Sequence, residues 1–391
     1  MVKEIIILGS TGSIGKSTLK VINNGRQKFK IKLLSTNNNI SLIYSQAIKF
    51  NVKTVVINNK FKFQNYKKLF KKKNIKVLFD FKSLNKILKK KVYYTINGIS
   101  GINGLEPTLC VIPYTNNIAI ANKESIICGW NFINKSLKKY KTSFIPIDSE
   151  HFSIWSLLKC ENLKNVKKIY LTASGGPFLN KKKSDLKNIK AAQAVKHPNW
   201  SMGKKISIDS ATMMNKIFEI IEAVKIFDLN INKFKILIHP KSYVHAIVQF
   251  QTGISKLLVH DTSMEIPIFN SLHQNYSESI YKNKIFNFKN LNGLNFVDPD
   301  YTKFPCLKLL KFIKVRNTYF EIILVSINDE LVKKYLKDQI SFITMQKNLL
   351  KLIKEPYFTK YYNRKPNNIN DIKNMVDNVV TYLNKIKFNE I

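Results

Sequence analysis

The sequence has few acidic residues and few cysteines, and both scarcities constrain what the protein does. Only 25 Asp and Glu residues oppose 65 Lys and Arg residues, so any cluster of carboxylates in this chain of formal charge +40 requires an explanation. The four cysteines lie far apart without metal-ligand spacing, which argues against a disulfide framework and predicts a cytoplasmic protein. No apolar run approaches the roughly 18 residues of a membrane span, and no signal segment precedes the first strand-like stretch. We therefore expect no membrane association.

The excess of lysine has two interpretations. Lysine is dense in segments 60–73, 86–91 and 181–190, as in proteins that bind nucleic acids. However, the excess extends through the whole chain and accompanies abundant Asn, Ile, Phe and Tyr, which are residue types written by A/T-rich codons. Mutational bias therefore explains the basicity as well as selection does. We expect no specific nucleic-acid partner and keep a basic nucleic-acid-binding protein as a rival interpretation.

The length and the order of the predicted elements indicate an α/β protein of several domains. Hydrophobic residues make up 45% of the 391 residues, which is ample for packed cores. Segments 14–23 and 124–139 have helical spacing, and they lie between strand-like runs at 4–8, 30–35, 54–57, 93–96, 117–121 and 143–147. This alternation predicts a parallel, doubly wound, Rossmann-like sheet. Further strands are expected at 168–172, 235–238 and 244–250, and helices at 210–227, 321–336 and 345–353. The expected domains are 1–150, 151–295 (α+β) and 296–391 (small and helical).

The segment GSTGSIG, residues 9–15, joins the first strand to the first helix. Its glycines allow a tight turn and a close approach to a pyrophosphate, and the helix start supplies free N–H groups. In this context the pattern predicts dinucleotide binding. The second strand ends in LLSTNNN, where an NAD site usually has an acid for the ribose 2′-hydroxyl. Because the acid is missing, the pattern favours NADP.

Two polar segments follow predicted strands, and each has two interpretations. ANKES, residues 121–125, is either a surface turn or part of a ligand site, because open α/β sheets bind ligands at the carboxyl ends of their strands. DSEH, residues 148–151, is either an exposed acidic turn or half of a metal site. In extended geometry Asp148 and Glu150 point to one side, with Ser149 and His151 facing elsewhere.

Segment 197–223 favours the metal interpretation. With Ser210 as the N-cap of a helix, Asn215, Glu219 and Glu222 lie at i, i+4 and i+7 beside Lys216 and form a polar face. An ordinary amphipathic helix explains the apolar stripe on the opposite side, but not this polar face. Glu219 would complete a three-oxygen site with Asp148 and Glu150, and oxygen ligands select Mg²⁺ or Mn²⁺.

Two further segments are candidates for binding. Ser174 with Gly175 and Gly176 can form a backbone nest for an anion. In HPKSYVH, residues 239–245, His245 lies within a strand-like run. It is there either a structural histidine or a catalytic one.

Together these residues resemble one family, 1-deoxy-D-xylulose 5-phosphate reductoisomerase. GSTGSIG, ANKES, PIDSEH, SGGPF, HPNWSMGKKIS, DSATMMNK and the spaced HP, S and VH of residues 239–245 occur in the order and at the spacing of that family. The similarity extends from residue 1 to about 250, and DPDY with FPCLKL marks the C-terminal part.

The resemblance implies an NADPH-dependent and Mg²⁺- or Mn²⁺-dependent homodimer that converts 1-deoxy-D-xylulose 5-phosphate to 2-C-methyl-D-erythritol 4-phosphate. It implies metal ligation by Asp148, Glu150 and Glu219, and proton transfer by Lys123 and Glu150. The expected substrate-binding residues are Lys123, Ser149, Glu150, Ser174, His197, Ser210, Asn215, Lys216 and Glu219. The expected cofactor-binding residues are Thr11, Gly12, Ser13, Ile14, Asn37, Asn38, Asn39, Asn122, Glu124 and Gly203. Segment 175–203 would be a lid that closes Trp200 over the substrate, with Met202 near the nicotinamide.

The sequence departs from the family pattern at three places. Asn38 stands where the family has a lysine for the 2′-phosphate, and Ser263-Met264-Glu265 replaces part of a Pro-Asp-Met-Arg pattern. A C-terminal Asn-Ala-Ala-Asn-Glu pattern is reduced to residues 326–330. The rival interpretations are a semialdehyde dehydrogenase, which needs a cysteine nucleophile beside a histidine, and a degraded, non-catalytic relative.

Overall fold

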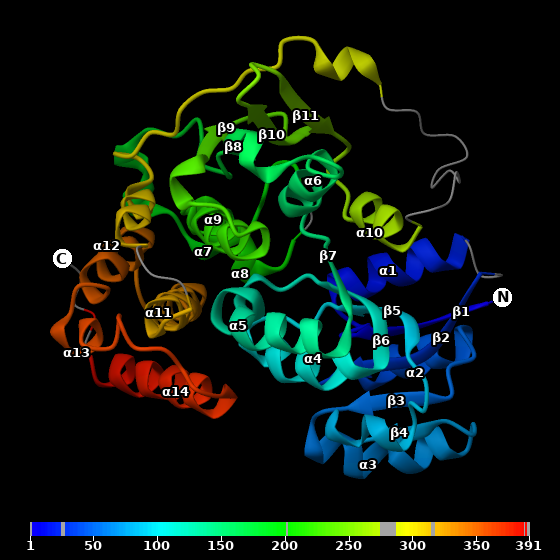
Figure 1. The fold of residues 1–391 in the computed structure, drawn as a ribbon. Coiled ribbons are helices and arrows are strands. Elements are labelled where there is room, and N and C mark those ends of the chain that lie inside the picture. Colours follow the sequence, from blue (N-terminus) through cyan, green and yellow to red (C-terminus); the bar gives the residue numbers. More distant parts are fainter. Residues whose placement is uncertain are drawn as a thin grey trace. The chain divides into compact units, whose positions relative to one another are not determined.

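The computed structural model describes residues 2–24, 28–200, 202–273, 287–313, 317–386 and 388, which form two compact units (Figure 1). Unit 1 contains the described residues within Met1–Ile126, Asn131–Phe152 and Ser263–Ile285. Unit 2 contains those within Ile127–Trp130, Ser153–Thr262 and Phe286–Ile391. The division into three domains at residues 150 and 295 stays a prediction.

Unit 1 is built on a parallel sheet of seven strands in the order β4-β3-β2-β1-β5-β6-β7. The order reverses at β1, so right-handed crossovers place the first helices on one face and the later helices on the other. The strands are β1 (Lys3–Leu8), β2 (Phe29–Thr36), β3 (Thr54–Ile57), β4 (Lys76–Leu78), β5 (Val92–Asn97), β6 (Thr115–Ile120) and β7 (Ser143–Pro146). The helices are α1 (Ser13–Asn24), α2 (Ile40–Lys49), α3 (Lys60–Lys71), α4 (Leu105–Val111), α10 (Glu265–Leu272) and the short η1 (Lys82–Lys86), η2 (Ile102–Gly104) and η3 (Ile112–Tyr114). Helix α5 (Lys123–Tyr140) belongs to unit 1 except for Ile127–Trp130, and helix α6 (Ser149–Leu157) belongs to it only as far as Phe152.

Continuous apolar runs explain the central strands of this sheet. Ile5, Ile6, Ile7 and Leu8 of β1 are each at most 1% exposed, without the alternation of a strand that faces water on one side. Strands covered on both faces have this pattern. At about 25 cal/mol per Å² of buried apolar surface, each such side chain stabilises the fold by roughly 1.5–3 kcal/mol.

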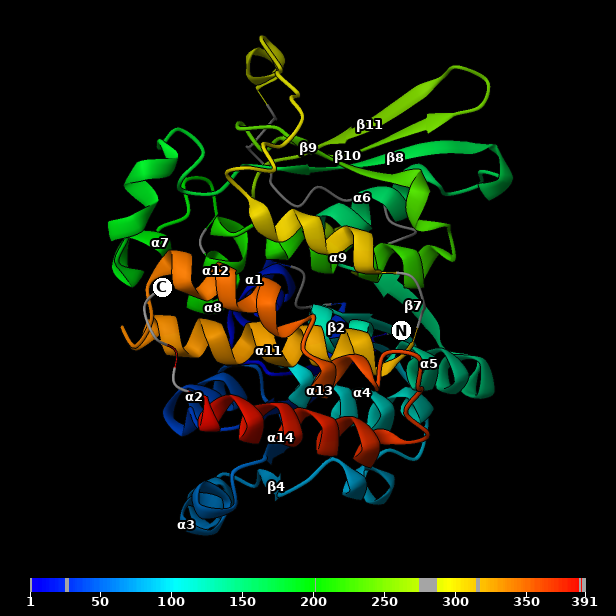
Figure 2. The same ribbon diagram turned by 90° about the vertical axis from the view of Figure 1, so that its left-hand side faces the viewer.

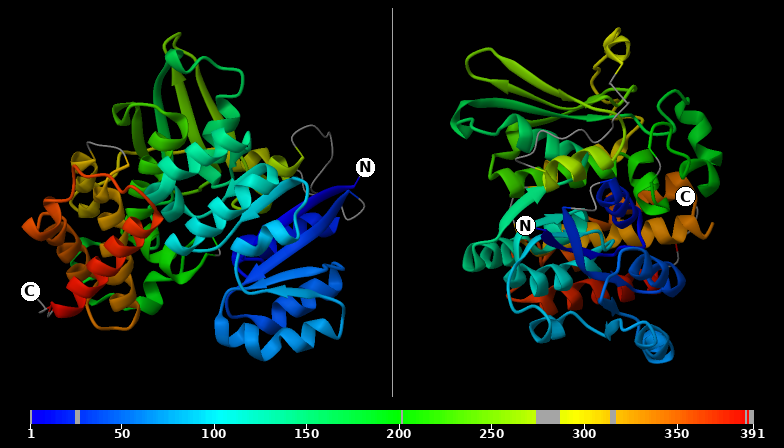
Figure 3. Two further views of the ribbon diagram at one scale, coloured as in Figure 1. Left: turned by 60° about the horizontal axis from the view of Figure 1, so that its bottom comes forward. Right: turned by 90° about the vertical axis from the view of Figure 1, so that its right-hand side faces the viewer.

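Unit 2 contains a second sheet in the order β11-β10-β8-β9, which Figure 3 shows from two sides. Strands β8 and β9 are parallel, whereas β10 pairs antiparallel with β8 and β11. Helix α9 packs against β8 (Figure 1). The elements are β8 (Val166–Ala173), β9 (Phe234–Ile238), β10 (Val244–Phe250), β11 (Ser255–Val259), α7 (Ala191–Ala194), α8 (Lys204–Ala211), α9 (Met214–Phe227), η4 (Leu163–Asn165), η5 (Lys183–Asn188), η6 (Ile231–Lys233) and η7 (Phe288–Leu291).

The C-terminal part of unit 2 is helical. Helices α11 and α14 lie side by side, and α12 packs against α11 (Figure 2). None of the helices in the described part of the chain combines the length and the apolar character that a membrane crossing requires. The elements are η8 (Pro305–Phe312), α11 (Tyr319–Leu336), α12 (Phe342–Leu352), α13 (Pro356–Thr359) and α14 (Ile369–Lys385).

The predicted strands and helices of the N-terminal part are confirmed within two residues, and so are the strands at 168–172, 235–238 and 244–250. Two local predictions are wrong. Ser210 is not the N-cap of a helix, because it lies in the last turn of α8, and α9 begins only after Met213, whose φ of +64° is left-handed. Residues 148–151 are not extended, because Ser149 begins helix α6.

Candidate active site

The turn between β1 and α1 requires glycine at two positions. Gly9 has a φ of +73°, and a Cβ there would lie 2.9 Å from the backbone of Gly98. A Cβ on Gly15 would lie 2.4 Å from the Cα of Ser10, so helix and turn approach more closely than any side chain permits. The expected cofactor residues Thr11, Gly12, Ser13 and Ile14 form this turn and the first residues of α1. Their backbone N–H groups are at a helix start, where an anion is favoured.

Hydrogen bonds join this turn to the end of β2. Gly9 N donates to Ser35 Oγ at 2.8 Å, and the hydroxyls of Thr11 and Thr36 lie 2.8 Å apart. Ser35 and Thr36 are at most 5% exposed. Their side chains therefore stabilise the turn itself, which makes them poor donors to a bound phosphate.

The three expected cofactor asparagines follow β2. Asn39 is the N-cap of α2, because its Oδ1 accepts a hydrogen bond from Leu42 N at 3.1 Å. Asn38 Oδ1 accepts a hydrogen bond at 3.0 Å from Nδ2 of Asn59, which follows β3. Asn59 cannot be recognised as a neighbour of Asn38 from the sequence, because only the pairing of β2 with β3 brings it to this turn.

The end of β6 leads directly into α5 through Asn122, Lys123 and Glu124. Asn122 is the N-cap of α5, since its Oδ1 accepts from Ser125 N at 3.0 Å. Lys123 is 7% exposed, and its Nζ lies 3.0 Å from Oδ2 of Asp148. This ion pair links the ends of β6 and β7, which are neighbours in the sheet. Lys123 is therefore not a solvated surface residue, which excludes the first of the two interpretations of ANKES.

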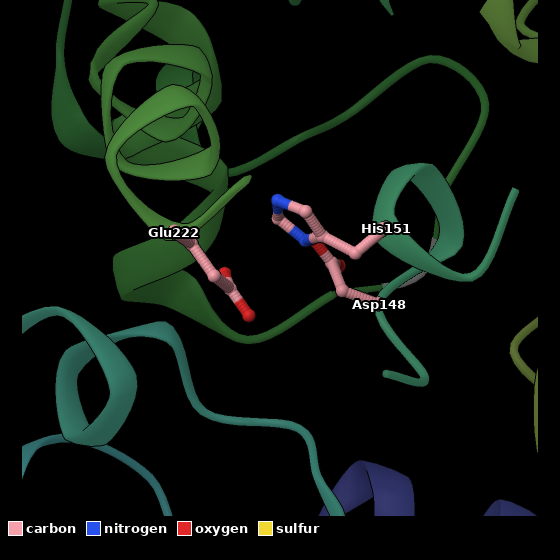
Figure 4. A group of neighbouring side chains, drawn as sticks. All are labelled: Asp148, His151 and Glu222. Carbon is pink, nitrogen blue, oxygen red and sulfur yellow. The ribbon is translucent and has the colours of Figure 1, made fainter. Parts of the chain in front are cut away.

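Asp148 lies between Lys123 and His151. His151 Nδ1 is 3.1 Å from Asp148 Oδ2, and Figure 4 shows both side chains at the beginning of α6. Burial raises the pKa of the Asp148 carboxyl, but the ammonium of Lys123 and the ring of His151 outweigh it, so the pKa lies well below its ordinary value. Asp148 is thus a carboxylate at any physiological pH. His151 is fully buried and faces Asp148, contrary to the expectation from extended geometry.

Ser149 and Glu150 occupy the first turn of α6. Ser149 Oγ donates to Glu150 Oε2 at 2.5 Å. Glu150 lies at the positive end of the helix, where a carboxylate is stabilised by roughly 0.3–1 kcal/mol. Unit 1 therefore brings together four of the predicted site residues, Lys123, Asp148, Ser149 and Glu150.

In unit 2, Ser174 and His197 are hydrogen-bonded. The distance from Ser174 Oγ to His197 Nε2 is 2.9 Å. His197 Nδ1 accepts from the backbone N–H groups of Asn199 at 3.2 Å and Trp200 at 3.0 Å, so the ring proton is on Nε2 and Ser174 Oγ accepts it. Gly176 N donates to the same Oγ at 3.0 Å. The hydroxyl proton of Ser174 is then directed to a further acceptor, as a phosphate site requires.

Gly176, which donates to Ser174, also lies against the backbone of Ser210. Gly176 has a φ of +68°, and a Cβ there would lie 2.9 Å from the carbonyl oxygen of Ser210. The predicted nest at Gly175 and Gly176 has left-handed φ values at both glycines. The turn after β8 therefore packs directly on the last turn of α8.

The first turns of α9 carry the other polar candidates of unit 2. Asn215 Nδ2 donates to Glu219 Oε1 at 2.5 Å, and Lys216 Nζ lies 2.5 Å from Glu219 Oε2. Glu219 is 1% exposed and Lys216 5%. The predicted polar face of this helix is thus correct, although the helix begins later than expected. Glu222, labelled in Figure 4, projects from the next turn and is 2% exposed.

Several of these side chains offer ligand atoms for a metal ion. Asp148, Glu150 and Glu219 each supply a carboxylate oxygen, as does Glu222, and His151 supplies a ring nitrogen. His151 and Glu222 were not among the metal ligands expected from the sequence. The spacing of i, i+3 between Asp148 and His151 would have indicated the first if DSEH had been read as a helix start. Gly203 is the N-cap of α8 in unit 2, and its role toward a cofactor stays a prediction.

Comparisons with known proteins identify the family. Residues 5–129 match the family described as 1-deoxy-D-xylulose 5-phosphate reductoisomerase, and residues 144–227 and 260–381 match two C-terminal domains of that enzyme. The reductoisomerase of Pelagibacter ubique is 53% identical over 379 residues, covering 96% of this chain and 97% of that protein. The enzyme of Wolbachia pipientis from Culex pipiens is 37% identical over 392 residues, covering 100% and 97%.

Solved structures agree over the whole chain. The Zymomonas mobilis enzyme in complex with NADPH has a TM-score of 0.85 at 27% identity, with 99% of this chain and 100% of that chain covered. A reductoisomerase complex with NADPH, fosmidomycin and magnesium has a TM-score of 0.89 at 29% identity, with 98% of each chain covered. The predicted fold class, with a Rossmann-like sheet, a second sheet and a helical C-terminal region, is confirmed. The chain belongs to the 1-deoxy-D-xylulose 5-phosphate reductoisomerase family.

Proposed function

We propose that the protein is an NADPH-dependent, divalent-metal-dependent reductoisomerase that converts 1-deoxy-D-xylulose 5-phosphate to 2-C-methyl-D-erythritol 4-phosphate in non-mevalonate isoprenoid biosynthesis. The observation that carries the proposal is that this chain, which is 53% identical over 379 residues to the reductoisomerase of Pelagibacter ubique, contains all of the carboxylate and phosphate-binding candidates. Solved relatives hold NADPH and magnesium.

The cation would be held by Asp148, Glu150 and Glu219. Carboxylate oxygens are hard ligands, and an all-oxygen set suits Mg²⁺ or Mn²⁺. The low pKa of Asp148 supports this role, because a ligand must be deprotonated when the ion binds. When bound, the cation polarises the carbonyl oxygen of the substrate, and NADPH supplies the hydride for the reduction.

The phosphate end of the substrate would be bound by Ser174, His197, Ser210, Asn215 and Lys216. The Ser174–His197 hydrogen bond supports this role, because it fixes the serine oxygen as an acceptor and frees its proton for an anion. Lys216 adds a cation that is 5% exposed, where its attraction for a phosphate is little screened by solvent.

Lys123 and Glu150 are the proposed groups for proton transfer, with Ser149 and Lys123 along the substrate backbone. Lys123 is buried beside Asp148, and this ion pair orients its side chain at the end of β6. Glu150 is two residues after Asp148 in the chain, so its carboxylate would be a proton acceptor close to the oxygens that the cation would bind.

Segment 175–203 is the proposed lid, with Trp200 over the substrate and Met202 near the nicotinamide. The segment contains η5 and α7, and Ser201 lies outside the described residues. Trp200 N donates to His197, so the position of the tryptophan is coupled to a phosphate-binding candidate. Closure would exclude water from the reactive aldehyde.

The protein is further proposed to be a cytoplasmic homodimer that docks through the sheet of unit 2. One face of this sheet packs on α9, while the other presents a row formed by Tyr170, Ile247 and Leu257, of which Leu257 is 47% exposed. A second copy of the same sheet would bury such a row. Light scattering should give a dimer, and Leu257→Lys should shift the equilibrium to monomer. A monomer at micromolar wild-type concentration would contradict this assembly.

The test of the function is NADPH oxidation that depends on both 1-deoxy-D-xylulose 5-phosphate and a divalent cation. A semialdehyde dehydrogenase would instead need a reactive thiol, and burial raises the pKa of the Cys306 thiol to about 12. A degraded relative would bind NADPH without oxidising it in the presence of substrate and Mg²⁺.

A further inference from the structure

The turn after β2 and the turn after β3 lie side by side in unit 1. The strands pair in parallel, with Thr36 opposite Ile57 at their carboxyl ends. Beyond this pair, Asn58 N donates to Thr36 O at 3.0 Å, and Asn59 Nδ2 donates to Asn38 Oδ1 at 3.0 Å. The position that follows Asn59 is therefore adjacent to the segment expected to meet the ribose of NADPH.

The segment after β2 has no cation of its own. Asn37, Asn38 and Asn39 are neutral, and the Oδ1 atoms of the last two already accept hydrogen bonds. Lys32 lies four residues before Thr36, about 13 Å back along the strand. Its Nζ is 3.0 Å from Glu4, so its charge is partly neutralised. The 2′-phosphate of NADPH needs a positive partner to be distinguished from the hydroxyl of NADH.

Lys60 is the cation closest in sequence to Asn59, and it begins α3. It is exposed, and among the described residues no hydrogen bond or ion pair holds its ammonium group. No acidic residue lies in the first turn of α2 or α3, so nothing acidic in either turn competes with a phosphate. The next lysine, Lys62, already has a partner on the same helix, because its Nζ lies 5.8 Å from the ring centroid of Tyr66 in the next turn of α3.

We propose that Lys60 determines the preference for NADPH by binding the 2′-phosphate, while the Asn38–Asn59 hydrogen bond holds the two turns together. The cation that the family pattern places on the turn after β2 is thus supplied from the turn after β3. This proposal rests on the proposed function, because it assigns a specificity residue to the same cofactor site.

The test compares Lys60→Ala with Lys71→Ala, which removes the same charge from the same helix about 16 Å away. Both residues are exposed, so neither change disturbs the core. Lys60→Ala should lower kcat/KM for NADPH about tenfold, the low end for a hydrogen bond to a charged group, and leave NADH within about twofold. Lys60→Glu should lower it further by repelling the phosphate. Lys71→Ala should leave both values within about twofold.

Binding of adenosine fragments provides a readout that does not depend on turnover. Calorimetry with 2′,5′-ADP should show the same tenfold loss in Lys60→Ala, with 5′-AMP unaffected. Asn59→Ser keeps a helix cap but removes the donor to Asn38, so it should weaken 2′,5′-ADP binding by a smaller factor.

The outcomes separate this proposal from the proposed function. An NADPH-to-NADH ratio within twofold of wild type in Lys60→Ala, or an equal fall in Lys71→Ala, overturns the role of Lys60 while the reductoisomerase activity stands. Loss of 2′,5′-ADP affinity in a protein without any substrate-dependent oxidation upholds Lys60 and overturns the function.

Discussion

Replacing Glu219 by glutamine removes a charge from the centre of the proposed metal site. Glu219 is 1% exposed and binds Asn215 and Lys216, each at 2.5 Å. Glutamine has the same shape and can still accept from Asn215, but it turns an amide toward the buried ammonium of Lys216. Loss of a charge partner in a buried pair costs about 3–5 kcal/mol of unfolding free energy, and the other contacts of Lys216 reduce this to about 2–3 kcal/mol. The melting temperature should then fall by roughly 2–4 °C.

The effect on catalysis should be larger than the effect on stability. A missing electrostatic contact to the reacting oxygens costs about 10²–10³ in kcat, and loss of the ion itself costs more. Turnover of 1-deoxy-D-xylulose 5-phosphate in Mg²⁺ should therefore fall at least about 10²-fold in Glu219→Gln and Glu150→Gln. NADPH affinity should change less than about twofold, because the β1–α1 turn is held by hydrogen bonds to Ser35 and Thr36, which neither substitution removes.

Glu161→Gln is the matched control. Glu161 is a surface carboxylate with 28% side-chain exposure that pairs with Lys256, so its loss removes one charge outside the proposed site. Its activity should remain within about twofold of wild type. If Glu150→Gln and Glu219→Gln both kept near-wild-type turnover in Mg²⁺, the assignment of the three carboxylates to a metal would be wrong.

Three further predictions concern the cofactor, the charge of the surface and pH. Asn38→Lys should widen the NADPH preference, because a charge-assisted bond of about 1.5–3 kcal/mol replaces a neutral one of about 1 kcal/mol; equal or better use of NADH by the wild type would refute this. DNA and RNA should bind weakly, without sequence preference and less as salt rises; a nanomolar, sequence-selective complex would refute it. Burial, together with Lys28 and Lys3, lowers the pKa of His273 from 6.5 to about 4, so the unfolded chain takes up the proton first as pH falls. The contribution of neutral His273 to the free energy of unfolding is therefore complete above about pH 6.5 and decreases toward pH 4, with about 2 kcal/mol lost at pH 5. Urea unfolding of His273→Phe should lack this decrease. A pH dependence of the free energy of unfolding equal to that of the wild type would refute the prediction.

The sequence predicted the central sheet well because its signal is local. Each parallel strand is a short apolar run, and the chain returns to the sheet through helical segments of recognisable spacing. The glycines of residues 9–15 were equally informative, because the close contacts at Gly9 and Gly15 permit no other residue. Strands β4 and β11 were missed. The first is only three residues long, and the first three residues of the second, from Ser255, are exposed, so neither carries a buried apolar run.

The sequence predicted the site less completely, because the features that were predicted wrongly depend on contacts between residues far apart in the sequence. The break between α8 and α9 depends on Met213 in a left-handed conformation and on Gly176 packing against Ser210. No residue type near Met213 indicates such a break. The sequence predicted that Lys123 and Asp148 both follow strands at the same edge of the sheet, but not that they form an ion pair. The Asn38–Asn59 hydrogen bond could not be expected without the register of β2 and β3.

The most direct test of the proposed activity is a steady-state assay of NADPH oxidation by the purified protein. We expect oxidation only when 1-deoxy-D-xylulose 5-phosphate and Mg²⁺ or Mn²⁺ are both present, with 2-C-methyl-D-erythritol 4-phosphate as the product. Chelation of the cation by EDTA should stop the reaction, and added Mg²⁺ should restore it. Oxidation that persists without the cation, or that does not respond to the substrate, would contradict the account.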